Sequence, residues 1–270
     1  RNLSLIRTDE CDADIAVQAK LVSARMLLSA GRVTEALETY GEVLDHDAED
    51  LWKFDVVARK NQMLAIESIV AAYDGGDYAR AIRYGETIHE KLRGVGGIPE
   101  CYCLSWTSLA YNESGDPHKA DELLRLAEHT YETSCGDSLW LKTHLKSIRA
   151  KYYRRDGETQ KSIDLYREVA ALSEESGDAW VRGDACFDII STGYLADLDT
   201  DPDGKYRDAL FALADATALP HLRYKADVVK FLSLPREEAI RRRGEYDAIP
   251  ALPSVSDATI RALVRKKTGA

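Results

Sequence analysis

Long apolar runs are missing from this sequence of 270 residues. No segment approaches the roughly 18 uninterrupted apolar residues that a membrane-spanning helix needs. Near the amino terminus, residues 3–6 are too few to form the apolar region of a secretory signal peptide. We therefore expect a cytoplasmic protein that makes no contact with a membrane. Because the chain begins with Arg1 and not with methionine, we also expect further residues upstream of it.

Sequence motifs of catalysis and cofactor binding are missing as well. The sequence has no His-Glu-x-x-His pair, no glycine-rich phosphate loop, no G-x-G-x-x-G after a strand and no G-x-S-x-G elbow. The cysteines form no C-x-x-C pair, and their odd number predicts reduced thiols in a cytosolic setting. They are Cys11, Cys101, Cys103, Cys135 and Cys186. The sequence therefore predicts a protein that is not an enzyme and that has no cofactor and no metal.

One acidic segment, residues 197–204, partly matches a calcium-binding loop, because aspartate stands at every second position and a glycine follows. In a calcium loop of the EF-hand type, glycine occupies position 6 and glutamate position 12. Here Gly204 occupies position 8, Asp208 occupies position 12, and Pro202 interrupts the pattern. These differences favour an inserted solvent loop over a calcium site.

Charge is distributed unevenly along the chain, whose formal net charge is −10. Residues 221–270 contain eleven basic and six acidic side chains, a net charge of +5, which leaves −15 for the residues before them. The acidic part would repel phosphate, so we expect no nucleic-acid binding through it. For the basic tail, a capping helix or a patch that faces the acidic part is favoured over contact with nucleic acid.

What the sequence does contain is one pattern repeated five times: an apolar helical stretch, a turn with a glycine, and a second amphipathic helix. The turn glycines are Gly31, Gly76, Gly115, Gly157 and Gly204. Five residues after each glycine stands a small residue: Ala36, Ala81, Ala120, Ser162 and Ala209. Four residues later stands a larger one, Tyr40, Leu124, Tyr166 or Leu213, except in the second copy, which has Gly85. Such repetition predicts stacked helix pairs that bury their apolar faces against their neighbours.

The periodicity of apolar residues places most of the helices. The turn Gly115-Asp116-Pro117 combines a helix stop, a helix cap and a residue suited to the first helical position. Residues 94–99 are expected to separate the second unit from the third. The expected helices span 15–28, 33–44, 51–73 and 78–92, the fourth unit spans 139–176 around a turn at 155–158, the fifth begins near 179, and the last three span about 221–232, 235–246 and 256–267.

Four segments carry a resemblance to the tetratricopeptide repeat family. They are LSAGRVTEALETYGEVL (28–44), AYDGGDYARAI (72–82), AYNESGDPHKADELLRLA (110–127) and YYRRDGETQKSIDLYREV (152–169). The resemblance implies an all-α, right-handed α-α superhelix of five helix pairs over 15–218, preceded by a short segment, 1–14, and followed by capping helices over 219–270. The small residues lie 45, 39, 42 and 47 positions apart, further than the usual spacing of about 34. This spacing is similar to that of bacterial regulatory proteins, such as sensor domains of the maltose-regulator type or peptide-sensing quorum regulators, and to kinesin light chain repeats.

The same resemblance implies that first helices line a concave groove, where a peptide or protein would bind. Carried onto this sequence, the groove positions include Arg25, Tyr73, Leu109, Asn112, Lys151, Arg154 and Asp188. An asparagine can bind the backbone of an extended peptide through its donor and its acceptor, and the neighbouring cations Lys151 and Arg154 can take a carboxylate. The alternative is that these cations form only a solvated face. The residue set that binds chaperone tails in some family members has no counterpart here.

Together these observations predict a non-catalytic module that binds a peptide or a protein. The more specific hypothesis is a sensor or effector domain of a cytoplasmic, bacterial-type signalling or transcription regulator. The alternative is a constitutive scaffold or adaptor within a multiprotein complex. A homodimer is compatible with both.

Overall fold

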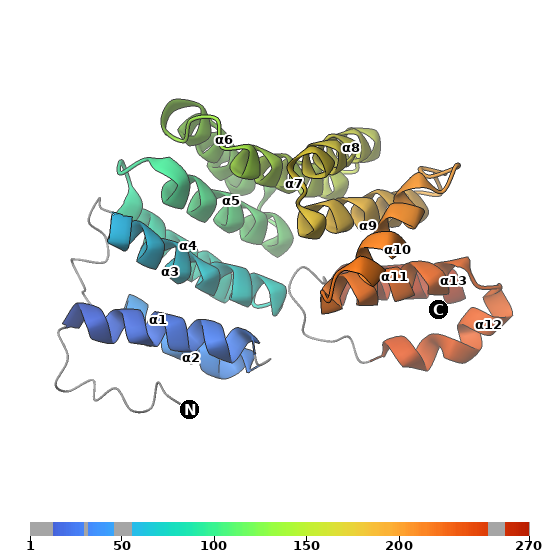
Figure 1. Cartoon of the computed structure of the whole chain (residues 1–270), viewed down its shortest axis with the longest axis horizontal. Helices are drawn as coiled ribbons and strands as arrows, with labels where there is room; N and C mark the ends of the chain where they lie inside the picture. The colour runs from blue at the N-terminus through green and yellow to red at the C-terminus, as the bar shows by residue number, and fades with distance from the viewer. Residues whose placement is uncertain (1–12, 30–31, 46–55, 248–256, 270) are drawn as a thin grey trace. The chain divides into compact units, whose positions relative to one another are not determined.

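The computed structural model describes residues 13–29, 32–45, 56–247 and 257–269, and all regular structure in these ranges is helical (Figure 1). The helices are α1 (Ala13–Ser29), α2 (Val33–Leu44), α3 (Val56–Asp74), α4 (Tyr78–Leu92), α5 (Gly97–Ser114), α6 (Pro117–Ser134), α7 (Leu139–Arg155), α8 (Thr159–Ser176), α9 (Ala179–Leu195), α10 (Lys205–Ala216), α11 (Pro220–Ser233), α12 (Arg236–Arg242), the 3-10 helix η3 (Arg243–Tyr246) and α13 (Asp257–Thr268). The predicted all-α fold class is confirmed for the described residues.

Consecutive helices pack as pairs: α1 with α2, α3 with α4, α5 with α6, α7 with α8, and α9 with α10. The chain divides into two compact units, residues 1–137 and 138–270. The first, called unit 1, contains the pairs from α1 to α6, and the second, called unit 2, contains α7 to α13. The predicted repetition of helix pairs is therefore confirmed, with three pairs in unit 1 and two pairs plus the last helices in unit 2.

The turn between α5 and α6 shows how the sequence sets these pairs. Gly115 ends α5 with a left-handed backbone, φ 97°, which side chains with a Cβ rarely adopt. The Asp116 carboxylate then accepts a hydrogen bond from the Lys119 backbone N–H at 3.0 Å. Pro117 is the first residue of α6, where no N–H partner is needed. The three roles predicted for this turn are confirmed.

The small residue of each second helix lies where two helices touch. Ala36, Ala81, Ala120 and Ser162 are completely buried, and Ala209 is partly buried. In two pairs the contact includes a hydrogen bond across the interface, from Ser108 Oγ to the Ala120 carbonyl at 2.7 Å and from Ser162 Oγ to the Ala150 carbonyl at 2.8 Å. These bonds join equivalent positions of two copies, so the repeat in sequence is also a repeat in packing.

Gly85, the exception at the larger position, allows α4 to approach α5 closely. Tyr40, Leu124 and Tyr166, at the same position of the other copies, are completely buried. A Cβ on Gly85 would stand 2.0 Å from Thr107 Oγ1, which is far inside van der Waals contact. Thr107 thus fills the space that a larger side chain fills in the other copies.

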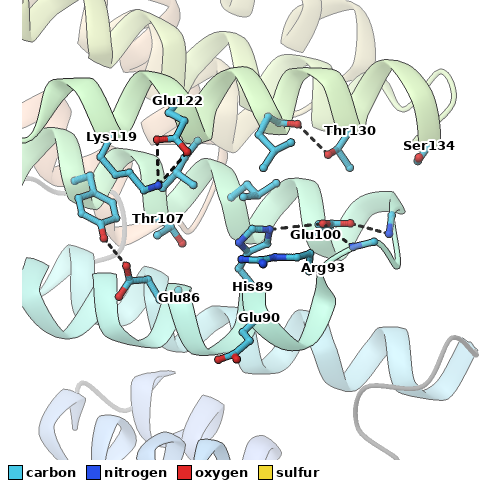
Figure 2. A pocket seen from close by; sticks show the side chains of 17 residues that line it. Glu86, His89, Glu90, Arg93, Glu100, Thr107, Lys119, Glu122, Thr130 and Ser134 are labelled. Carbon is cyan, nitrogen blue, oxygen red and sulfur yellow. Dashed lines mark hydrogen bonds and ion pairs between the residues drawn. The ribbon is translucent and has the colours of Figure 1, made fainter.

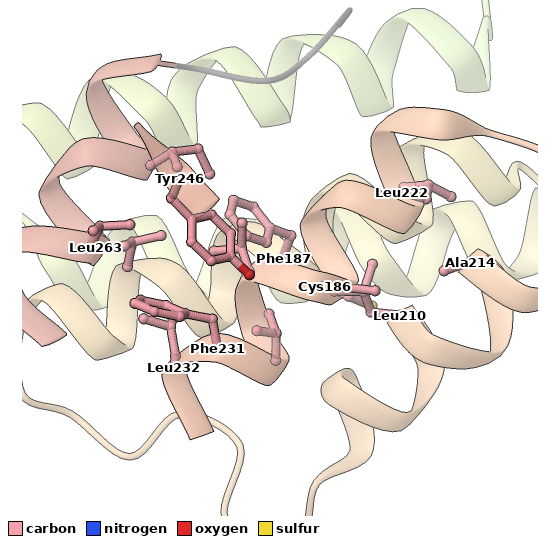
Figure 3. Packing of buried hydrophobic residues seen from close by; sticks show 14 of the residues in the cluster. Cys186, Phe187, Leu210, Ala214, Leu222, Phe231, Leu232, Tyr246 and Leu263 are labelled. Carbon is pink, nitrogen blue, oxygen red and sulfur yellow. The ribbon is translucent and has the colours of Figure 1, made fainter. Parts of the chain in front are cut away.

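The helices after Pro220 share one core with the last helix pair (Figure 3). This core gathers buried side chains from α9, α10, α11, η3 and α13, including Phe187, Leu210, Phe231, Tyr246 and Leu263. The rings of Phe231 and Tyr246 lie 4.5 Å apart. The final helices therefore cap α9 and α10, as predicted.

The basic tail contacts the acidic part of the chain within unit 2. Lys266 Nζ, on α13, donates a hydrogen bond to the Leu195 carbonyl at the end of α9 (2.8 Å) and lies 2.7 Å from the Asp197 carboxylate. A cation at the carboxyl end of a helix also complements the helix dipole. This arrangement matches the favoured interpretation of the tail as a capping element that faces acidic residues.

Two expectations need correction or qualification. Pro99 does not separate helices, because it is the third residue of α5, where the first-turn N–H groups have no intrahelical partner and proline is tolerated. The acidic segment after α9 caps α10, since Asp201 accepts hydrogen bonds from the backbone N–H groups of Tyr206 and Arg207, both at 2.9 Å. The turn at Gly31 and residues 51–55 lie outside the described residues.

Candidate interaction surfaces

In unit 1, two of the predicted groove residues lie at the surface of the first helices. Arg25, on α1, is exposed and forms an ion pair with Glu67 of α3 at 3.5 Å. Tyr73, near the end of α3, is half-buried between two aromatic rings, those of Tyr78 and Trp106, with ring centroids 5.5 Å away in each case. Three aromatic rings therefore cluster at this end of α3. Of the three residues, the sequence analysis predicted only Tyr73 as part of the binding surface.

Leu109 and Asn112, both on α5, are buried, with 1 % of each residue exposed. Within the described part of the chain, neither Nδ2 nor Oδ1 of Asn112 has a hydrogen-bond partner. A buried amide without partners costs on the order of 1–3 kcal/mol. The structure therefore places these two residues in the interior of the helix layer, and their predicted contact with a partner stays a prediction.

In unit 2, the structure brings two predicted groove residues together. Arg154, on α7, and Asp188, on α9, form an ion pair at 3.4 Å, and both are mostly buried. Sequence patterns placed each of them in the groove without indicating this pair. Because Asp188 already neutralises Arg154, a carboxylate from a partner would compete with an internal one.

The exposed face of α7 also carries two aromatic residues that the sequence analysis missed. Trp140, 42 % exposed, stacks on His144 with ring centroids 6.0 Å apart and an interplanar angle of 12°. Burial and the nearby charge of Lys151 lower the pKa of His144 to about 3, so its ring is neutral at pH 7. Trp140, His144, Lys151 and Arg154 follow helical spacing, and all four are at least partly exposed. Extending that spacing about two and three turns toward the start of α7 would have found His144 and Trp140.

A buried charged cluster lies between α9 and α11, also in unit 2. Lys225 Nζ lies 2.7 Å from the Asp184 carboxylate, and only 3 % of Lys225 is exposed. His221 Nε2 lies 3.7 Å from the same carboxylate, and the Trp180 ring covers His221 at 3.9 Å between centroids. Burial lowers the pKa of His221 to about 4, although Asp184 acts in the opposite direction. The i, i+4 spacing of His221 and Lys225 is the one sequence pattern that accompanies this cluster.

A groove of about 710 Å³ runs between the second helices α4 and α6, over α5, entirely within unit 1 (Figure 2). We call it the α4–α6 groove. Its floor consists of small and aliphatic residues, which are Gly85, Leu104, Thr107, Leu123 and Leu126. Its rims carry charged and polar side chains: Glu86, His89, Glu90 and Arg93 on α4 and at its end, and Lys119, Glu122, Thr130 and Ser134 on α6.

One end of this groove is closed by the glycine-rich loop between α4 and α5. The Glu100 carboxylate accepts hydrogen bonds from the backbone N–H groups of Gly94 (3.2 Å) and Gly96 (2.7 Å), which fixes the start of α5. His89 Nε2 lies 3.6 Å from the same carboxylate (Figure 2). Burial lowers the pKa of His89 despite this contact. The ring is therefore neutral at pH 7, and Glu100 is held mainly by backbone donors.

Among the described residues, no group of three or more histidine, cysteine, aspartate or glutamate side chains is arranged to hold a metal ion. None of the described helices combines the length and the apolar character needed to cross a membrane. The described cysteines, Cys101, Cys103, Cys135 and Cys186, are free thiols.

No protein-family model and no curated protein matches this chain. Solved structures that resemble it include the nearly identical TPR-like repeats of a protein described as a kinesin light chain from Podosopora anserina, at 16 % identity and a TM-score of 0.48 over 76 % of this chain and 96 % of that one. A second structure of the same repeats has 16 % identity and a TM-score of 0.44 over 74 % and 93 %. The organisation of this chain in tetratricopeptide-like helix pairs follows from its own packing, described above. Stacked pairs of this kind present extended surfaces to other molecules.

Proposed function

We propose that this chain is a non-catalytic module that binds a peptide segment of a partner protein through the exposed faces of its first helices. The observation that carries the proposal is the face of α7, where the exposed Trp140 stacks on the partly buried His144 and is followed by Lys151 and Arg154 at helical spacing. Tryptophan and arginine dominate the energetics of protein interfaces, because they combine large apolar area with directed polar groups. A neutral His144 leaves the stack free of a second positive charge beside Lys151.

The Arg154–Asp188 pair gives this face a means of selecting its ligand. A partner carboxylate that displaces Asp188 from Arg154 gains an ion pair but leaves Asp188 without its cation, so simple acidity is a poor criterion for binding. A partner that stacks on Trp140 and places a hydrogen-bond acceptor near Lys151 leaves the internal pair intact. We infer that the preferred peptide contributes an aromatic or aliphatic side chain together with one acceptor group.

The more specific role is that of a sensor or effector domain of a cytoplasmic regulator. Support for it comes from the long spacing between repeats and from the reduced state of the described cysteines. In the alternative role, a constitutive scaffold, binding leaves the chain unchanged. Hydrogen exchange of the full chain with and without a bound peptide separates the two roles, because a sensor shows altered protection in helices away from the peptide and a scaffold does not.

The first test is a random-peptide display selection against the full chain, followed by affinity measurements on the enriched peptides. We expect Trp140→Ala and Lys151→Glu each to weaken the selected peptides by about tenfold or more, as loss of an interface anchor does. Lys161→Glu, a charge reversal at an exposed position of the second helix α8, is the matched control and should leave affinity unchanged. Selected peptides whose affinity is the same for all three variants would place binding elsewhere and contradict the proposal.

A further inference from the structure

We propose that the α4–α6 groove is a second binding site, which takes a basic amphipathic helix from a partner protein. The site lies between the second helices α4 and α6, whereas the function proposed above rests on the exposed face of the first helix α7, so the two proposals are independent. The first observation is the apolar floor. Leu126 is 41 % exposed and lies beside the fully buried Leu104 in a hollow of about 710 Å³. A volume of this size accommodates several aliphatic side chains, and covering the exposed leucine removes apolar surface from water.

One residue of the groove floor is the sequence exception, Gly85. At the position of Gly85 three other copies have Tyr40, Leu124 and Tyr166, each completely buried, and the fifth copy has the partly buried Leu213. Without a side chain there, α4 rests directly on Thr107, and both residues line the groove. The close contact of α4 with α5 at this sequence exception is therefore part of the groove floor.

The second observation is charge. With His89 neutral, the lining contains four glutamates against Arg93 and Lys119, a net charge of −2. Lys119 is already paired with Glu122 at 3.0 Å across one turn of α6. Glu86 accepts a hydrogen bond at 2.5 Å from the Tyr111 hydroxyl, a neutral group that brings no positive charge to the rim. Glu86 and Glu90 stand one turn apart on the α4 rim, which makes this rim acidic and favours lysine or arginine in the partner.

The third observation concerns backbone hydrogen bonds, which any bound segment must satisfy. Several polar groups of the groove already form hydrogen bonds or ion pairs within the chain. Thr107 Oγ1 donates to the Cys103 carbonyl (2.8 Å), Thr130 Oγ1 donates to the Leu126 carbonyl (2.9 Å), and Lys119 pairs with Glu122. An extended peptide would find few partners for its N–H and C=O groups here. A helix satisfies its own backbone and needs only an apolar face, the recognition mode in which a helix lies in a groove.

The length of the groove fits such a helix. The lining residues on α6 run from Lys119 to Ser134, and fifteen steps of about 1.5 Å correspond to roughly 22 Å, or about four helical turns. A four-turn helix presents aliphatic residues at positions i, i+3 or i+4, and i+7 to the floor while its flanks reach the α4 rim. The partner segment is therefore an amphipathic helix with lysine or arginine on the flank that faces Glu86 and Glu90.

The test uses a display library of stable four-turn helices with randomised surface positions, selected against the full-length chain. We expect enriched helices to carry an aliphatic stripe flanked by lysine or arginine, and to lose about tenfold or more in affinity for Leu126→Asp. The double variant Glu86→Lys, Glu90→Lys should weaken them by a similar factor, and helices with glutamate in place of the flanking basic residues should then bind the double variant better than the wild type.

Two matched controls carry equivalent changes outside the groove. They are Ile240→Asp, at an exposed apolar residue of unit 2, and Glu132→Lys, at an exposed position of α6 that does not line the groove. Both should bind as the wild type does, and thermal melting should show that every variant is folded. Enriched helices without a basic flank, affinity unaffected by Leu126→Asp, or a selection that yields no saturable binder would each overturn the proposal. Loss of binding through Trp140→Ala alone would assign the helix to the face of α7 and would overturn it too.

Discussion

At the scale of single residues, the buried charges of unit 2 determine how α9 and α11 pack against each other. Lys225 is only 3 % exposed, and its ammonium group lies 2.7 Å from Asp184 Oδ1, the same oxygen that lies 3.7 Å from His221 Nε2. A buried ion pair adds little net stability, because both ions lose hydration, but removing one partner leaves an uncompensated charge and is costly. These residues therefore fix which faces of α9 and α11 meet.

Because His221 is neutral in the folded protein, its titration predicts a loss of stability in acid. The pKa of histidine is about 6.5 in an unfolded chain and is lowered to about 4 in the fold by burial. As the pH falls, the unfolded state therefore binds the proton before the folded state does. The contribution of neutral His221 to the free energy of unfolding is complete above about pH 6.5 and is lost as the pH falls toward 4, by about 2–3 kcal/mol at pH 4.5. Urea unfolding at pH 7.0 and 4.5 should show a smaller pH dependence for His221→Gln than for the wild type. The exposed His118→Gln is the control, and an equal pH dependence in all three proteins would contradict the assignment.

At the scale of elements, α4 differs from the other second helices because the residue through which it contacts α5, Gly85, has no side chain. Gly85 is completely buried, and Thr107 occupies the space in front of it. Glycine in a helix interior usually costs about 1 kcal/mol relative to alanine. Here the close approach of the two helices outweighs that cost, since a Cβ would overlap Thr107.

We therefore expect Gly85→Ala to destabilise the protein by about 1–3 kcal/mol, the opposite of its usual effect in a helix. The double variant Gly85→Ala, Thr107→Ala should recover part of this loss, because the shorter side chain removes the two nearest clashing atoms. Chemical denaturation measures the free energy of unfolding for both, with Gly244→Ala as a control at a glycine whose Cβ would meet only Asp247 Oδ2, at an ordinary contact distance of 3.9 Å. A Gly85→Ala variant as stable as the wild type would show that the helices can separate without cost.

The sequence predicted these elements well where the signal was local. The bounds of α2, α4 and α8 agree with apolar periodicity and with turn residues, because glycine, aspartate and proline act within a few positions of themselves. It could not predict the Arg154–Asp188 pair, whose members are 34 residues apart and meet only through the packing of two helices. The Gly85 exception was visible, but its close contact with Thr107 depends on how α4 packs on α5, which sequence spacing does not indicate. The burial of Asn112 likewise depends on neighbouring helices and not on its own position in the repeat.

At the scale of the whole molecule, the chain forms two compact units, and unit 2 has a core of its own that includes the final helices. Repeat proteins bury most of their apolar surface between neighbours, so stability is local. A defect deep in one unit should therefore act mainly within that unit.

Phe231→Ala tests this locality. Phe231 is 1 % exposed and packs against Tyr246, so its truncation should cost about 3–5 kcal/mol within unit 2. Hydrogen exchange followed by mass spectrometry should show faster exchange across α9, α11 and α13, with much smaller changes in α4, α5 and α6. Equal acceleration in both units would mean that the chain unfolds as a single cooperative body.

The division between the units has a consequence for how such a chain can change over evolutionary time. The short connection between Ser134 and Leu139 joins the two units, and α7 begins with its own cap, because Ser138 Oγ accepts a hydrogen bond from the Leu141 backbone N–H at 3.4 Å. A duplication that inserted one more pair at this connection would disturb neither the core around Phe231 nor the contact of Gly85 with Thr107. Growth and loss by whole pairs is therefore the kind of variation that this architecture tolerates best.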